Sequence, residues 1–360
     1  MLSTLDTGLI FAYLALMIAI GLYASRKQDS VEDFFIAGGR LGTFSIACLW
    51  LASWVGGATV VGGVAKAYEF GISGSWYTIC MAIGCLTFGL FFAARVKRWG
   101  NERQLLTYPD LMESVYDSRT RIVSTITTIF AYVGFAAGQL AAAGAILSML
   151  LGWDYSTSLL LASAIIVVYT ATGGFLAVTY TDWVQFALLF IGIVIIGIPI
   201  AIESGGTWEA LSTQLPSEHF NPTGWGVATM LALGVSLPLS FFVAMDNYTR
   251  MFAARNEQVA KRGTLLATVF LLPIAVGTVW IGMTAVLTHP GIENGDSVLS
   301  TFVEDAAFWS ITISLITVIG WYVGSTLELA SIFTVDPLWP GLLVSIVVFT
   351  GISVVAGTRE

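Results

Sequence analysis

The chain has 360 residues, of which 56% are hydrophobic and only 11% are charged, and its mean hydropathy is +0.84. Soluble globular domains carry about a quarter charged residues, so this composition excludes an ordinary soluble protein and indicates a polytopic membrane protein. The formal net charge of -8 comes mainly from residues in the loops. A negative charge gives no reason to expect a nucleic-acid partner.

Ten apolar runs are long enough to cross a hydrocarbon core about 30 Å thick. They lie at residues 7–24, 43–68, 73–95, 123–151, 157–176, 182–203, 225–249, 263–288, 307–324 and 339–356. We therefore expect an all-α protein of the lipid bilayer with about ten transmembrane helices. No basic residue precedes the first run, so a retained helix is expected there rather than a cleaved signal peptide.

The second run is interrupted in its middle by residues that weaken a helix. These are Ser53, Gly56, Gly57, Thr59, Gly62 and Gly63. Irregular backbone inside a membrane survives only where protein buries it or where it lines a cavity. A discontinuous span therefore indicates a transport site, where freed carbonyls could bind a cation. The same glycines could instead let neighbouring helices pack closely, and spacing alone leaves the two interpretations equal.

Basic residues cluster after the first, third and seventh runs, within 26–40, 95–121 and 250–262. By the positive-inside rule these loops are cytoplasmic, which places the N-terminus outside. The turn expected at 178–181 falls on the same cytoplasmic side. The last two runs break the pattern, because the loop at 325–337 would be cytoplasmic without a basic residue.

Several charged groups lie close to apolar runs, where an ionisable side chain is a functional candidate. Asp182 begins the sixth run, so it could complement the helix dipole beside a capping threonine. Alternatively, Asp182 borders an ion path on the cytoplasmic side. Asp246 stands four residues before Arg250, which predicts a pair on one helix face. Lys66 and Glu69, three residues apart, are predicted to pair in the same way.

The sequence contains no zinc-protease, nucleophile-elbow or phosphate-loop motif, so an enzyme is not expected. The three cysteines, Cys48, Cys80 and Cys85, all lie within apolar runs without the spacing of a metal site. We expect them to be small core residues.

Three motifs resemble those of the sodium:solute symporter family. They are DFFIAGGR at 33–40 with the Ala-Ser pair at 52–53, TATGGFLAVTYTDWVQ at 170–185, and the basic segment 250–255. They occur in the family's order over roughly residues 5–300. The resemblance implies an extra N-terminal helix (1–42) followed by a five-plus-five inverted repeat, with the first repeat at 43–203.

The resemblance also implies the site residues and the coupling ion. Backbone carbonyls of the broken helix, which would bind sodium, map onto Ala52 and Val55. Substrate would lie between the broken regions of spans two and seven, where the freed helix ends supply polarity. The substrate residues would be Ser53, Trp54, Gly56, Thr59, Phe241 and Phe242. Sodium would be the only metal ion needed, and no cofactor is expected.

The chain departs from the family pattern after residue 304, where the helix with hydroxyl ligands for sodium should follow. Thr301 and Glu304 fit a capping box better than that hydroxyl motif, and 305–360 resembles the family's C-terminal hairpin. About three helices of the second repeat, which would occupy 225–304, are therefore expected to be missing. An odd number of missing helices would invert the hairpin and account for the anomalous loop at 325–337.

We therefore expect a secondary active transporter of the cell membrane that performs sodium-coupled symport of a small organic solute. Two carbonyls without the partner hydroxyls leave a dehydrated cation short of ligands, so weak or absent sodium coupling is predicted. The alternative is a non-transporting remnant, or a membrane interaction subunit that needs a partner chain to supply the absent helices. The sequence does not identify the solute.

Overall fold

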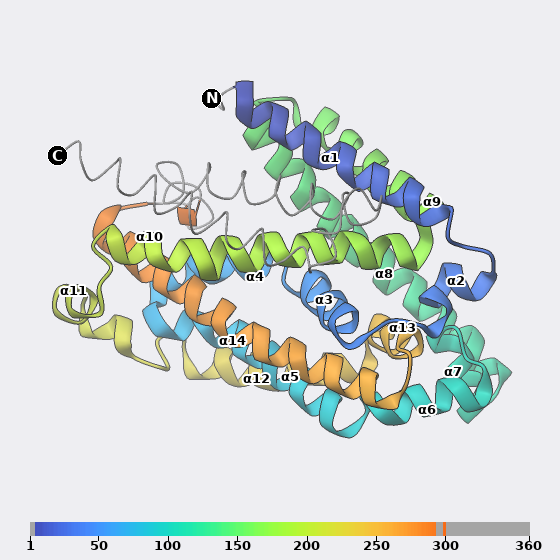
Figure 1. The fold of residues 1–360 in the computed structure, drawn as a ribbon. Helices are drawn as coiled ribbons and strands as arrows, with labels where there is room; N and C mark the ends of the chain where they lie inside the picture. Colours follow the sequence, from blue (N-terminus) through green and yellow to red (C-terminus); the bar gives the residue numbers. More distant parts are fainter. Residues whose placement is uncertain (1–3, 293–297, 300–360) are drawn as a thin grey trace, which may run out of the picture. The chain divides into compact units, whose positions relative to one another are not determined.

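The computed structural model describes residues 4–292 and 298–299, which fold almost entirely into helices (Figure 1). Within these residues the only β pairing is an isolated parallel bridge between Leu41 and Ala254. The expected spans at 307–324 and 339–356, the capping box and the C-terminal hairpin lie outside the described residues.

The helices follow one another along the chain, most of them separated by short connections. They are α1 (Thr4–Ser25), α2 (Val31–Ile36), η1 (Ala37–Gly39), α3 (Thr43–Trp54), α4 (Gly57–Phe70), η2 (Gly71–Ser75), α5 (Trp76–Phe91), α6 (Ala93–Arg103), α7 (Tyr108–Val115), α8 (Ser118–Leu151), α9 (Tyr155–Phe190), η3 (Ile191–Gly197), α10 (Ile198–Glu203), α11 (Trp208–Gln214), η4 (Ser217–Phe220), α12 (Val227–Val243), α13 (Met245–Ala253) and α14 (Glu257–Thr288). Of the η elements, η3 is a π-helix and the others are 3-10 helices.

The chain divides into two compact units, each described by itself below. Among the described residues, unit 1 contains the chain up to Trp54 together with Met81–Trp183 and Val235–Val269, and unit 2 contains Val55–Cys80, Val184–Gly234 and the described residues from Phe270. The repeat boundaries expected from the sequence follow a different partition and stay a prediction.

Four helical segments of the described chain are long and apolar enough to cross a membrane, and one bent pair makes a fifth. They are Thr59–Phe91, Ser118–Ser148, Tyr155–Glu203 and Glu257–Thr288, with Val227–Val243 and Met245–Ala253 as the pair. Shorter apolar helices, Ile10–Ser25 and Thr43–Trp54, match the first run and the first half of the second. Apolar runs two to eight are thus helical apart from local breaks and their ends.

The second span is broken, as the sequence predicts. α3 ends at Trp54 and α4 begins at Gly57. Gly56, the N-cap of α4, has extended backbone (φ -106°, ψ -165°), and no side chain caps the first turn. Close packing also occurs, but further along the helix, because a Cβ on Gly63 would lie 3.5 Å from the Thr278 side chain. Both interpretations of the glycines therefore apply, at different positions.

The seventh span is broken as well, although its sequence contains no glycine at the break. α12 ends at Val243 and α13 starts at Met245, with a bend of 50° between them. Ala244 between the two helices has extended backbone (φ -70°, ψ 116°). Pro238 lies inside α12, where it removes one backbone donor from the helix.

The turn expected at 178–181 is wrong, because those residues are helical and the break lies at Gly174 (φ 52°, ψ -152°). A straight helix over the whole 49-residue segment Tyr155–Glu203 would be about 73 Å long, more than twice the hydrocarbon thickness. The break divides it into two spans of suitable length. A Cβ at Gly174 would lie 2.7 Å from the Phe34 ring and 2.8 Å from the Phe34 carbonyl oxygen, so the approach of α2 requires glycine there.

Helix α1 packs along the first part of α9 within unit 1 (Figure 1). A Cβ on Gly21 of α1 would lie only 2.7 Å from Cβ of Tyr169, so the two backbones come close. The Gln28 amide, in the loop after α1, donates to the carbonyl of Gly173 just before the break. These contacts fix the position of the extra N-terminal helix on α9.

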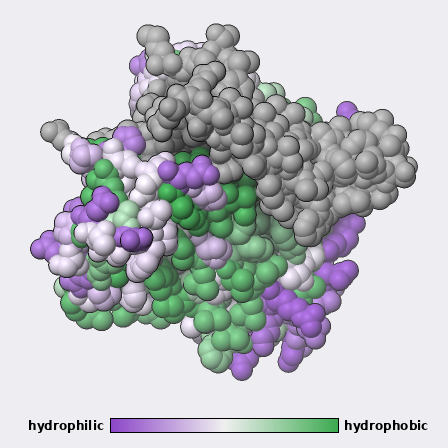
Figure 2. Space-filling view, turned by 60° about the vertical axis from the view of Figure 1, so that its left-hand side comes forward, coloured by the Kyte–Doolittle hydropathy of each residue, from purple (hydrophilic) through white to green (hydrophobic). Residues whose placement is uncertain are grey.

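Much of the visible described surface is apolar (Figure 2). On α8 large apolar side chains are exposed along the helix, among them Ile122, Val123, Ile126, Ile129, Phe130, Val133 and Phe135. An apolar face of this length suits a lipid environment rather than water.

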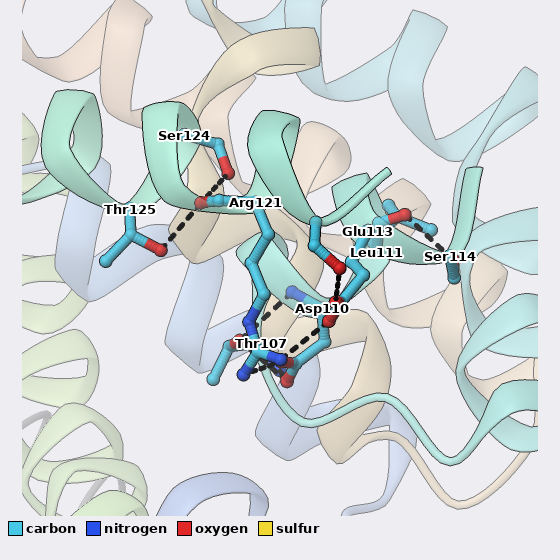
Figure 3. Close-up of polar contacts among 9 residues, drawn as sticks. Thr107, Asp110, Leu111, Glu113, Ser114, Arg121, Ser124 and Thr125 are labelled. Carbon is cyan, nitrogen blue, oxygen red and sulfur yellow. Dashed lines mark hydrogen bonds and ion pairs between the residues drawn. The ribbon is translucent and has the colours of Figure 1, made fainter. Parts of the chain in front are cut away.

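A polar corner joins the short helix α7 to α8 in unit 1 (Figure 3). Thr107 and Asp110 form a capping box at the start of α7. Arg121 of α8 reaches back to Asp110 at 3.1 Å and to Glu113 at 2.6 Å. The corner lies within the second basic cluster, and the charge of its Arg121 is partly neutralised by these two carboxylates.

Candidate functional site

Three aromatic rings stack in unit 1 near the ends of α3 and α12, the helices that precede the breaks of spans two and seven. The Phe241 ring of α12 lies 4.3 Å from the Trp54 ring and 5.6 Å from the Trp50 ring, with interplanar angles of 16° and 6°. Phe241 is almost completely buried, whereas Trp54 is half-buried. Stacking buries the Phe241 and Trp50 rings, so the half-buried Trp54 is the ring of this stack that retains exposed apolar surface.

Asn247 of α13 connects this stack to both broken spans. Its Oδ1 accepts hydrogen bonds from Trp54 Nε1 at 3.2 Å and from Arg250 Nη1 at 2.7 Å. Its Nδ2 donates to the Phe241 carbonyl at 2.8 Å. Asn247 is fully buried, so loss of its amide would leave buried polar groups without this partner, at a cost of about 1–3 kcal/mol for each group left unsatisfied.

The carbonyls freed by the break of span seven are occupied by side chains. The last carbonyls of a helix lack an intrahelical partner. At the end of α12, Asn247 satisfies the Phe241 carbonyl, and the Tyr248 hydroxyl donates to the Phe242 carbonyl at 2.6 Å. Side chains of α13, the helix that follows the break, therefore satisfy these two carbonyls.

Arg250 in unit 1 contacts both a carboxylate and an aromatic ring. Its guanidinium lies 2.6 Å from Asp246 Oδ2, which confirms the predicted pair on one helix face, and it stands over the Trp50 ring at 5.3 Å. The Tyr132 hydroxyl of α8 donates to the other oxygen of Asp246. Arg250 itself is buried, and a buried charge needs such partners.

Asp182 lies inside α9, about two turns beyond Gly174, so the expectation that it starts a helix is wrong. The preceding threonine does not cap it, because the Thr181 hydroxyl donates to the Val178 carbonyl. Asp182 is buried, and its Oδ2 has no hydrogen-bond partner among the described residues. Arg250 is a charged group that interacts with it electrostatically.

The C-terminal end of α13 is held by backbone and by a buried amine. Leu41 N–H donates to the Ala253 carbonyl at 3.0 Å, and Lys97 Nζ of α6 donates to the Phe252 carbonyl at 2.8 Å. Burial lowers the pKa of the Lys97 ammonium below its ordinary value of 10.5. The negative end of the α13 dipole compensates part of that cost.

The structure brings together some of the predicted site residues. Trp54 and Phe241 are in contact in unit 1, where Ala52 is half-buried, Ser53 is exposed and Phe242 is half-buried. Val55, Gly56 and Thr59 belong to unit 2, where Val55 and Thr59 are buried. The roles assigned to these residues stay predictions.

Two further predictions concern residues outside the aromatic stack. Lys66 and Glu69 are paired at 2.8 Å, as expected. The three cysteines are buried and free, which confirms them as core residues. Sequence reasoning missed Asn247, Tyr132 and Lys97. The only signal was polarity inside or beside an apolar run, because their partners are distant in sequence.

Comparison with known proteins gives the chain its family. The profile of the sodium:solute symporter family matches residues 34–319. The high-affinity proline transporter PutP of Bacillus subtilis is 24% identical over 277 residues, 74% of this chain and 58% of the relative. The high-affinity choline transporter 1 of Caenorhabditis elegans is 32% identical over 197 residues, 52% of this chain and 33% of the relative.

A solved structure of a Na+-coupled sialic acid symporter has the same fold. Its TM-score is 0.73 at 20% sequence identity, and the alignment covers 99% of this chain and 83% of that chain. The chain spans about half the length of the curated relatives it matches. The match over residues 34–319 shows that this multi-pass membrane protein belongs to the sodium:solute symporter family.

Proposed function

We propose that this chain is a secondary transporter that couples movement of a small organic solute to the sodium gradient. The observation that carries the proposal is that spans two and seven are both broken, at Val55–Gly56 and at Ala244. Broken spans supply ion and solute sites inside a membrane. Family membership supports the same reaction class, and the relatives named above transport proline and choline.

Sodium binding in this proposal uses the span-two break. Ala52 lies in the last turn of α3, whose carbonyls have no intrahelical partner, and Val55 lies in the break itself. Their carbonyl oxygens are the proposed ligands, and Asp182 lies on the proposed path of the ion. Two carbonyls do not complete the shell of a dehydrated cation, so we expect sodium coupling to be weak.

The solute in this proposal lies against the aromatic stack. Trp54, backed by the buried ring of Phe241, presents a half-buried indole, and Ser53 beside it presents an exposed hydroxyl. Ring faces suit a solute with an apolar or a cationic part. Gly56, Thr59 and Phe242 complete the proposed set.

The proposed orientation has the N-terminus outside the cell membrane. The polar corner of α7 and α8 and the basic segment 250–262 would then face the cytoplasm, in agreement with the positive-inside rule. The proposed repeats are 43–203 and 225–304.

Uptake into proteoliposomes tests the proposal. The purified chain is reconstituted, and uptake of radiolabelled proline and choline is measured with an inward sodium gradient and with potassium in its place. We expect uptake of a small organic solute that sodium stimulates weakly and that Phe241→Ala abolishes. Absence of uptake for a broad solute panel under both gradients would contradict the proposal.

A second candidate is a membrane subunit that needs a partner chain. In this proposal the partner would supply parts of the fold that lie outside the regions matched to the curated relatives named above, of which this chain covers 58% and 33%. Purification in mild detergent from its native membrane tests it. A stoichiometric second membrane protein whose addition restores uptake would support this candidate, and a chain active by itself would reject it.

A further inference from the structure

Unit 2 contains a second cluster of aromatic and charged side chains, which the proposed function does not use. Lys66 Nζ lies 2.8 Å from Glu69 Oε2. The same ammonium stands over the Phe70 ring at 5.1 Å and over the Trp225 ring at 5.9 Å. We call Glu69, Phe70 and Trp225 the ammonium box.

The two rings of the ammonium box are held by the local fold. Phe70 ends α4 and is followed by Gly71, where a Cβ would lie 1.9 Å from the His219 carbonyl oxygen. Trp225 follows a tight turn in which Asn221 Oδ1 accepts from the backbone of Thr223 at 3.0 Å. The rings stack at 6.4 Å with an interplanar angle of 20°. The box is therefore built by backbone packing rather than by the lysine.

The chemistry of the ammonium box is that of an organic-cation site. An ammonium group over aromatic faces is attracted by the negative ring faces, and a carboxylate beside it adds charge attraction. Lys66 places its own ammonium there, as a tethered ligand would. The positive-inside pattern does not explain this lysine, because Lys66 lies within the second apolar run and outside the three basic clusters.

Lys66, which lies over the ammonium box, is on the same face of α4 as Thr59, a proposed substrate residue. Thr59, Gly62 and Lys66 occupy positions i, i+3 and i+7 of α4, which share one face. Two turns of helix place Lys66 about 10 Å beyond Thr59. No described residue lies within 4 Å of a Cβ built on Gly62, which lies between them.

We infer that Glu69, Phe70 and Trp225 form a binding subsite for organic ammonium groups, and that Lys66 fills it and so discriminates against cationic solutes. The discrimination among solutes rests on the proposed transport function. The binding subsite does not, because it follows from the geometry within unit 2. A solute without positive charge does not bind in the ammonium box, so Lys66 does not compete with it.

Equilibrium binding of radiolabelled tetramethylammonium to the purified full chain in nanodiscs tests the inference at low ionic strength. This measurement needs no transport, so failure of the proposed function leaves it intact. We expect weak binding to the unchanged protein and to Lys66→Arg, which keeps the cation. Lys66→Ala is expected to bind at least about tenfold more tightly, since the rings and Glu69 become available.

Two double variants show whether the gain comes from the box. K66A combined with Glu69→Gln, and K66A combined with Trp225→Leu, are each expected to lose most of the gained affinity. If K66A binds tetramethylammonium no better than the unchanged protein, the inference is overturned. It is also overturned if K66A gains affinity that survives both second substitutions. A cluster that only stabilises the end of α4 would lower the melting temperature in K66A without any gain in binding.

Discussion

The break between α3 and α4 and the break between α12 and α13 free backbone groups in different chemical settings. At the first, Gly56 gives the N-cap of α4 no side-chain oxygen. At the second, Asn247 and Tyr248 donate to the carbonyls of Phe241 and Phe242. The difference teaches that a broken span is not by itself an ion site. The missing cap at the first break leaves N–H donors of α4 open, which do not bind a cation, so the proposed sodium site there depends on the carbonyls of Ala52 and Val55. At the second break, side chains hold the freed carbonyls.

The largest expected effect comes from removing the side chain that closes the second break. Asn247→Leu keeps the volume but leaves the Trp54 indole, the Arg250 guanidinium and the Phe241 carbonyl each short of a partner. We expect a loss of about 2–4 kcal/mol in stability, because buried polar groups become unsatisfied. A thiol-reactive dye reports unfolding in this protein, since Cys48, Cys80 and Cys85 are all buried.

Asn247→Asp is the matched control for this variant. Its carboxylate still accepts from Trp54 and Arg250, and only the donor to the Phe241 carbonyl is lost, so we expect a smaller loss than for Leu. Equal melting temperatures for N247L and the unchanged protein would show that the second break does not depend on side chains.

A moderate effect, with a distinctive pH dependence, is expected at Lys97, which holds the far end of α13. Burial lowers the pKa of Lys97 from 10.5, so the folded state binds this proton less tightly than the unfolded chain does. The charge therefore costs stability below the folded pKa, and the cost disappears as the pH rises towards 10.5. Lys97→Met removes that rise and loses a hydrogen bond of about 1 kcal/mol.

The melting temperatures of Lys97→Met and of the unchanged protein are measured at pH values from neutral to alkaline. Their difference reports on Lys97, because the other titrating groups are the same in both proteins. Lys97→Arg keeps its charge throughout and should also lack the rise. A difference that does not change with pH would argue that Lys97 is not buried as a cation.

A smaller effect is expected at the first break. The extended backbone of Gly56 accepts any residue, so Gly56→Ser can supply the missing N-cap oxygen. We expect a gain of about 0.3 kcal/mol in stability, with weaker solute binding because the oxygen occupies backbone donors at the start of α4. Gly56→Ala, which lacks the oxygen, is the control. If G56S binds solute normally, the open backbone of the first break has no part in binding.

The smallest effect is expected at the exposed pair between Arg98 and Glu257, which lies just beyond α13. Arg98 contacts Glu257 through two hydrogen bonds of 3.0 and 2.8 Å, but exposed ion pairs contribute little to stability. Glu257→Gln should leave the melting temperature unchanged at low and at high salt. A clear fall would show that the start of α14, and not Lys97, anchors the second break.

The sequence by itself determined the features that depend on neighbouring residues. The apolar runs, the break at Gly56, the pair of Asp246 with Arg250 and the pair of Lys66 with Glu69 all follow from composition or from helix spacing. Such features need no knowledge of what packs against them. The turn at 178–181 was wrong because its true position, Gly174, is set by the approach of Phe34.

Only the tertiary structure decided which side chains meet at the second break. Trp54 and Asn247 are 193 residues apart, and Tyr132 and Asp246 are 114 residues apart. No local pattern specifies contacts at such separations, because they depend on how whole helices pack. The buried position of Asp182 and the ammonium box around Lys66 were decided in the same way, by segments that the chain brings together only when it folds.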